Sequence, residues 1–219
     1  MLEFPIVYKF AVSFTWGSIL PKTFDTFSQD HQSSVRELAK LSFLSADTLA
    51  FGEYWFSRPR VDFVPDRSDI DPTDIPSLLS NLLIYEYEGP YNLRIRLAGT
   101  SLVARHGREI TGLNLMDMVP PENYEDASWL FQQIVTQPCG CLSHGHAKSL
   151  SGRRVHFEIL FFPARNRQGK IDQIVAHSIG KEPDRYYDTA SERVAETKEF
   201  QRTLIDIGAG VPDDPRKAK

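Results

Sequence analysis

Short runs of alternating apolar and polar residues predict the strands of this chain. Leu93, Ile95 and Leu97 share one parity while Arg94 and Arg96 share the other, which is typical of a strand with one buried face. Comparable runs predict four further strands, at Leu82 to Glu88, Cys141 to Ser149, Arg153 to Phe162 and Ile171 to Ile179. The turn-forming residues between neighbouring runs favour antiparallel hairpins.

Apolar residues at helical spacing predict two longer helices. The first runs from Ser45 to Arg58, with Ser45 as its N-cap and Pro59 at its end. The second runs from Glu122 to Thr136, follows two prolines and carries carboxylates in its first turn, where the helix dipole favours them. Its predicted buried stripe is Tyr124, Ala127, Leu130, Phe131, Ile134 and Val135, with Trp129 at the edge.

Glycines mark the junction that follows the Leu93 strand. Gly99 releases the backbone at its end, Thr100 is a candidate N-cap, and Gly107 closes the short helix between them. Near the C-terminus, the charged stretch from Pro183 to Phe200 is compatible with a helix. Gly208 to Lys219 is predicted to be disordered.

Composition narrows the class of protein. The chain has 219 residues and a formal net charge of -4, which provides no electrostatic drive toward nucleic acid or anionic membrane. Phe10 to Leu20 is apolar but too short to cross a bilayer, so no membrane association is predicted. Cys139 and Cys141 are the only cysteines and make a poor disulfide framework for this length. A reducing cytoplasm is the predicted location.

Three motifs carry a family resemblance. The run RLAGTSL (Arg96 to Leu102), the turn GREITG (Gly107 to Gly112) and the lead-in DIDPTDIPSLLSNLLIYEYE (Asp69 to Glu88) together resemble small, mostly stand-alone bacterial PAS domains. The resemblance covers about Ser45 to Glu182. It implies an α+β PAS fold, a five-stranded antiparallel sheet with helices inserted on one face, here with an N-terminal helical extension. PAS domains are sensory and interaction modules, so the resemblance implies sensing without naming what is sensed. The partners expected are a second copy in a homodimer and an unidentified signalling protein, with a small molecule as a candidate ligand.

The chain is accordingly divided into four parts. Residues 1–44 are interpreted as a leader and linker, partly disordered, and residues 45–77 as the flanking helix and lead-in. Residues 78–182 form the predicted PAS core, and residues 183–219 a partly disordered C-terminal extension. For residues 1–33 three interpretations stay open: a native segment, a targeting segment and a misassigned translation start.

The resemblance also implies a cavity beside the long helix. By expected facing, its wall includes Leu97, Leu102, Leu115, Trp129, Phe131 and Phe157. Flavin-binding light sensors of this fold carry a cysteine directly after the Asn of a G-x-N motif, and here Asn114 is followed by Leu115. A covalent flavin photoadduct is therefore not expected, although non-covalent flavin binding stays open. A haem is not expected either, because no histidine stands in a spacing that demands one, and the cofactor is otherwise unknown.

Other chemistry finds less support. The nearest approach to a metal site is a group of thiols and imidazoles, which bind zinc well: Cys139, Cys141, His144 and His146. Strand alternation directs the cysteines and histidines to opposite faces unless Gly140 or Gly145 forms a bulge, so no metal site is predicted. Neither a G-x-S-x-G motif nor a phosphate loop is present, and we predict no catalytic residues and no enzyme activity.

We interpret the chain as a sensory or regulatory module that binds a small ligand or a protein partner. It transmits its state through the flanking helices and has no catalytic output domain. Two alternatives stay open: a ligand-free dimerisation or scaffold domain, and a small α+β enzyme with a buried carboxylate or histidine. A polar pocket favours the sensor, a core packed solid favours the scaffold, and converging titratable groups favour the enzyme.

Overall fold

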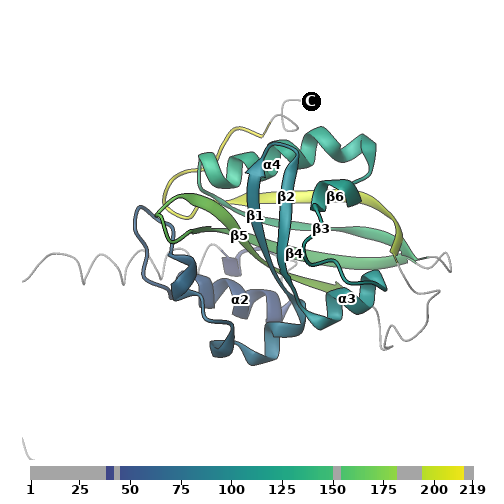
Figure 1. Cartoon of the computed structure of the whole chain (residues 1–219), viewed down its shortest axis with the longest axis horizontal. Coiled ribbons are helices and arrows are strands. Elements are labelled where there is room, and N and C mark those ends of the chain that lie inside the picture. Colours follow the sequence, from purple (N-terminus) through teal and green to yellow (C-terminus); the bar gives the residue numbers. More distant parts are fainter. Residues whose placement is uncertain (1–37, 42–44, 150–153, 182–193, 215–219) are drawn as a thin grey trace, which may run out of the picture.

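The computed structural model describes residues 38–41, 45–149, 154–181 and 194–214. Its strands are β1 (Leu82–Gly89), β2 (Asn92–Ala98), β3 (Gly140–Ser149), β4 (Arg154–Arg165), β5 (Ile171–Lys181) and β6 (Val194–Ile205). They form one antiparallel sheet in the order β2-β1-β5-β4-β3-β6 (Figure 1). The α+β fold with five predicted strands is confirmed, and the sheet has one strand more.

The additional strand, β6, lies where the sequence suggested a helix. It pairs with β3, with Cys141 opposite Leu204, so the helix expected from Pro183 to Phe200 is wrong for its described part. An edge strand accommodates charged residues, which is why the segment could be mistaken for a solvent-exposed helix. After β6 the chain packs back onto the domain as far as Asp214, whose side chain is buried. Residues 182–193 and 215–219 lie outside the described part.

The helix α2 (Ala46–Phe56) covers one face of the sheet (Figure 1). It begins as predicted, because the Ser45 hydroxyl accepts a hydrogen bond from the Thr48 amide at 3.0 Å. Trp55 of this helix is fully buried and stacks on Phe162 of β4, with ring centroids 4.4 Å apart. The Trp55 indole N–H also donates to the Pro163 carbonyl at 3.1 Å. This helix is therefore part of the folded core.

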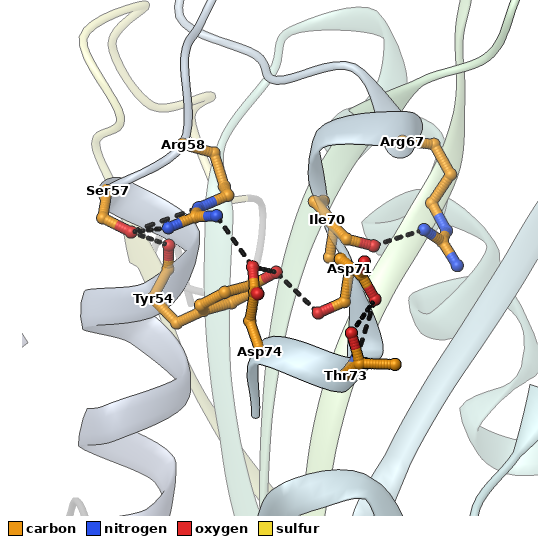
Figure 2. A network of polar contacts seen from close by, with 8 residues as sticks. All are labelled: Tyr54, Ser57, Arg58, Arg67, Ile70, Asp71, Thr73 and Asp74. Carbon is orange, nitrogen blue, oxygen red and sulfur yellow. Dashed lines mark hydrogen bonds and ion pairs between the residues drawn. The ribbon is translucent and has the colours of Figure 1, made fainter. Parts of the chain in front are cut away.

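Polar contacts fasten the end of α2 to the lead-in that precedes β1 (Figure 2). The Tyr54 hydroxyl donates to the Asp71 carbonyl at 2.9 Å, and Arg58 forms an ion pair with Asp74 at 3.1 Å. The Asp71 carboxylate accepts from the Thr73 amide and hydroxyl, both at 2.8 Å, which lowers the pKa of Asp71. Asp71 thereby caps η2 (Pro72–Asp74), and Asp74 ties the end of η2 to α2. The lead-in contains two further 3-10 helices, η1 (Arg67–Asp69) and η3 (Pro76–Asn81).

The opposite face of the sheet carries α3 (Thr100–His106) and α4 (Tyr124–Thr136), as Figure 1 shows. Gly99 occupies the N-cap position of α3, one residue before the predicted Thr100. Gly107 closes α3 as predicted, in the left-handed region with φ of 63°. The helix α4 starts two residues later than expected, after a 3-10 turn, η5 (Pro121–Asn123). The space between this helical layer and the sheet holds the candidate site.

Candidate functional site

A cavity of about 220 Å³ lies between the sheet and the helical layer of α3 and α4. Most of its wall is apolar, built from side chains such as Leu83, Ile95, Ile110, Leu130 and Phe161. All six strands contribute to it. The polar side chains on the wall are Arg105, His106, Asn123, Asp126, Ser143, Ser178 and Arg202. An apolar cavity with a few polar groups is the usual form of a small-molecule site.

The structure brings four of the six sequence-derived positions to this wall: Leu102, Leu115, Phe131 and Phe157. Leu97 and Trp129 lie elsewhere. Leu97 packs on the α2 side of the sheet with Ile84. A bulge explains this, because Ile84 pairs with Leu97 while the next residue, Tyr85, pairs with Ile95, so that Arg96 is left over. One extra residue reverses the facing of every later side chain in the strand.

Trp129 misses the cavity for a different reason. Its ring lies against the guanidinium of Arg202, with 4.7 Å between the Arg202 Cζ and the ring centroid, and so forms a cation–π contact. The apolar pattern of α4 predicted that Trp129 lies at the edge of the buried face. That pattern contains no information about a charged partner on β6. Trp129 therefore contacts Arg202, which lines the cavity, without lining the cavity itself.

The loop that follows α3 is held by the amide of Asn114. Its Oδ1 accepts from the Leu93 amide at 3.0 Å and from the Met116 amide at 3.1 Å, and its Nδ2 donates to the Tyr91 carbonyl at 3.0 Å. Met116 belongs to a 3-10 turn, η4 (Leu115–Met118). Within the G-x-N motif, the asparagine thus fixes the loop to β2 and orients Leu115 toward the cavity.

The same loop runs along the outer side of β2. The Gly112 amide donates to the Ile95 carbonyl at 2.7 Å, and the Ile95 amide donates to the Leu113 carbonyl at 2.9 Å. Gly112 has φ of 87°, in the region that favours glycine. These bonds hold the loop, which contributes Ile110 and Leu115 to the cavity wall, against the edge of the sheet.

Two arginines give the cavity its polar side. Arg105 of α3 donates to the Ser178 carbonyl at 2.7 Å and to the Asn81 side-chain oxygen at 2.8 Å, which ties α3 to β5. Arg202 of β6 donates to both carboxylate oxygens of Asp126, at 2.7 and 3.0 Å. Sequence reasoning did not single out Arg202, because it is one of several charged residues in a segment with no family motif.

The α2 side of the sheet contains a buried imidazole, His177 of β5. It stacks on Phe51 with ring centroids 5.7 Å apart, and neither ring nitrogen has a hydrogen-bond partner among the described residues. Burial lowers the pKa of His177 to about 4, while nearby Asp47 and Glu158 oppose that shift and Arg105 supports it. The imidazole is therefore neutral at pH 7.

This buried imidazole predicts a loss of stability in mild acid. A histidine whose folded pKa lies below its ordinary value of about 6.5 contributes fully above pH 6.5, and protonation then favours unfolding as the pH falls toward 4. Between pH 7.5 and pH 5 we expect His177 to cost about 2 kcal/mol of unfolding free energy. Urea unfolding of the wild type and of His177→Leu at both pH values measures this. The gap between the two proteins must shift by that amount, and an equal gap at both pH values contradicts the prediction.

The cysteines and histidines considered for zinc are separated by the sheet. Cys139 and Cys141 are buried in the α4-side core, whereas His144 alternates to the α2 side with Leu142 and contacts Gln201 at 3.0 Å. In the described ranges, no group of three or more His, Cys, Asp or Glu side chains is placed to hold a metal ion.

Comparison with known proteins establishes the family. The sequence matches the PAS domain family over residues 44–177, more than half of the chain, and the protein belongs to that family. PAS domains are typically sensory or regulatory modules. No curated protein matches the chain.

Solved structures with similarity include a light-oxygen-voltage domain studied with a flavin analogue, at 11% identity and a TM-score of 0.39, covering 50% of this chain and 83% of that one. The PAS domain of BvgS from Bordetella pertussis has 13% identity and a TM-score of 0.32, covering 52% and 88%. The PAS domain of an HTR-like protein from Haloarcula marismortui has 14% identity and a TM-score of 0.34, covering 50% and 90%.

Of the helices in the described part of the chain, none combines the length and the apolar character needed to cross a bilayer.

Proposed function

We propose that this protein is a sensory PAS module that binds a small molecule in the cavity between its sheet and α4. The observation that carries the proposal is the cavity itself, which has apolar walls and a limited set of polar groups. A domain that served only as a scaffold would gain stability by filling this space with its own side chains.

The dimensions of the cavity limit the ligand. Its volume of about 220 Å³ is below the roughly 300 to 1,000 Å³ that drug-sized ligands occupy. This favours a mainly apolar molecule smaller than a flavin or a haem. Leu102, Leu115, Phe131 and Phe157 are the proposed apolar contacts, and Ser178 with the two arginines supplies hydrogen bonding.

A non-catalytic role fits the titratable groups on the cavity wall. Among the described side chains there, Asp126 is the carboxylate and His106 the imidazole, and Asp126 is already engaged by Arg202. That pairing supports a structural use of the carboxylate over acid–base chemistry. We further propose that the module works as a cytoplasmic homodimer and passes its state to a separate partner protein.

Native mass spectrometry tests the ligand directly. Protein purified from its own host is expected to carry a small molecule in stoichiometric amount, which is lost on denaturation. An absorption spectrum and metal analysis of the same sample report any chromophore or ion. A clean apoprotein from the native host, with no added mass, would count against a tightly bound ligand and favour a protein-interaction domain.

A substitution that fills the cavity tests whether the ligand binds there. Ala127 of α4 is half-buried on the cavity wall, and we expect Ala127→Phe to lower ligand occupancy at least tenfold by filling the space. The control is Ala104→Phe on the exposed side of α3, which leaves the cavity unchanged. Occupancy is read by native mass spectrometry, and folding by circular dichroism. Equal occupancy in both folded variants would show that the molecule binds elsewhere.

A further inference from the structure

The wall of the cavity includes a residue from a strand that lies wholly outside the segment that matches the PAS family. The match ends at residue 177, whereas Arg202 belongs to β6, which starts at Val194. The Arg202 side chain is only 3% exposed and lines the cavity. A segment beyond the matched domain therefore completes the site.

Arg202 joins β6 to α4 by a dense set of contacts. Its guanidinium donates to both carboxylate oxygens of Asp126, at 2.7 and 3.0 Å, and to the Asp126 carbonyl at 3.0 Å. Trp129, one turn further along α4, packs against the same guanidinium. A two-point arginine–carboxylate pair fixes orientation as well as distance, so the position of β6 depends on the position of α4.

The same guanidinium holds the segment after β6. Asp214 lies 3.4 Å from Arg202, and its side chain is 2% exposed. Removing one partner of a buried ion pair is strongly destabilising, because the other partner is left as an uncompensated charge in the protein interior. The Arg202 side chain thus connects the cavity wall with α4, β6 and the C-terminal segment. We call Arg202, Asp126, Trp129 and Asp214 the Arg202 clamp.

We propose that the Arg202 clamp couples the cavity to the docking of β6 and the segment up to Asp214, so that an occupied cavity favours the docked strand. This inference rests on the proposed ligand-binding function. The wall is complete only when Arg202 is in place, so a molecule that contacts the wall binds the docked form more tightly. The two equilibria are linked. If the ligand raises the docking equilibrium constant by some factor, the undocked form binds the ligand more weakly by the same factor. Weakening the clamp therefore lowers ligand affinity. Signal output then leaves through the C-terminal strand.

Hydrogen exchange measured by mass spectrometry tests the clamp without any ligand. In Asp126→Asn, which retains the buried Arg202–Asp214 pair, the amides of residues 201–205 are expected to exchange about fivefold faster. In Arg202→Gln they are expected to exchange at least tenfold faster. Amides of β1 and β5 should stay within twofold in both variants. The control is Arg94→Gln, which removes an exposed ion pair with Glu88 and should leave residues 201–205 unchanged.

Two results would overturn the proposal. One is unchanged exchange in residues 201–205 of Asp126→Asn. The other is equal acceleration throughout the sheet, which means general destabilisation. Should Arg202→Gln fail to fold, Asp126→Asn alone decides between these outcomes.

A second arm places an occupant in the cavity by mutation. Ala127→Phe is expected to slow exchange of residues 201–205 at least threefold when Arg202 is present, and to have no effect in an Asp126→Asn, Arg202→Gln background. An equal effect in both backgrounds, or none in either, rules out Arg202 as the coupling residue. Because neither arm uses the native ligand, failure to find one by mass spectrometry leaves the test of the clamp unaffected and is recognised separately.

Discussion

Replacement of Trp55 by alanine is expected to lower the unfolding free energy by about 4 kcal/mol, since large aromatic deletions in a core cost roughly 3 to 5 kcal/mol. The side chain is fully buried, stacks on Phe162 and donates to the Pro163 carbonyl. The variant therefore loses apolar contact and leaves a buried carbonyl without its partner. Urea unfolding at pH 7.5, followed by circular dichroism, measures the loss.

Two comparisons make the Trp55 result specific. Trp55→Phe keeps an aromatic ring over Phe162 and should lose about 1 to 2 kcal/mol, because the hydrogen bond is removed and the ring is smaller. Tyr91→Ala, at a largely exposed ring that stacks on Tyr124 of α4, should lose no more than about 1 kcal/mol. A loss below about 1 kcal/mol for Trp55→Ala would mean that α2 unfolds independently of the sheet.

The second large effect is expected from Gly99→Ala. An added Cβ at this position would lie 2.3 Å from the Leu79 carbonyl oxygen and 2.4 Å from that of Ser80. Both are backbone atoms of η3 and have no rotamer through which to move away. We expect a loss of about 3 kcal/mol, at the upper end of the usual cost of overpacking, measured by urea unfolding at pH 7.5.

Gly112→Ala separates crowding from backbone strain. Gly112 has φ of 87°, and a Cβ added there would meet open space, so alanine should cost about 1 to 2 kcal/mol through conformation alone. Gly99 instead has φ of -66°, which any residue adopts. If Gly99→Ala proved no more destabilising than Gly112→Ala, the close approach of η3 to the start of α3 would be wrong.

Gly99 also shows how far sequence reasoning reaches. The RLAGTSL motif located the glycine correctly at the strand-to-helix junction, but local pattern suggested backbone freedom as its role. The structure instead shows close packing against the Leu79 and Ser80 carbonyls, contributed by a segment about twenty residues earlier. Such contacts depend on tertiary arrangement, which a local motif does not contain.

The same distinction accounts for the candidate site. Strand and helix periodicity identified the five PAS strands and placed Leu102 and Phe131 on the cavity wall, because both follow from the facing of a regular element. Leu97 failed because a bulge at Arg96 interrupts that regularity. Arg202 was missed because its importance comes from partners on α4 and after β6, which no spacing within its own segment reveals.

The loop that pairs with the outer side of β2 has a further consequence for assembly. Through the Gly112 amide and the Leu113 carbonyl, it occupies backbone groups that an approaching strand would need. A strand added at the β2 edge, from a second copy or an extended peptide, would therefore first have to displace this loop.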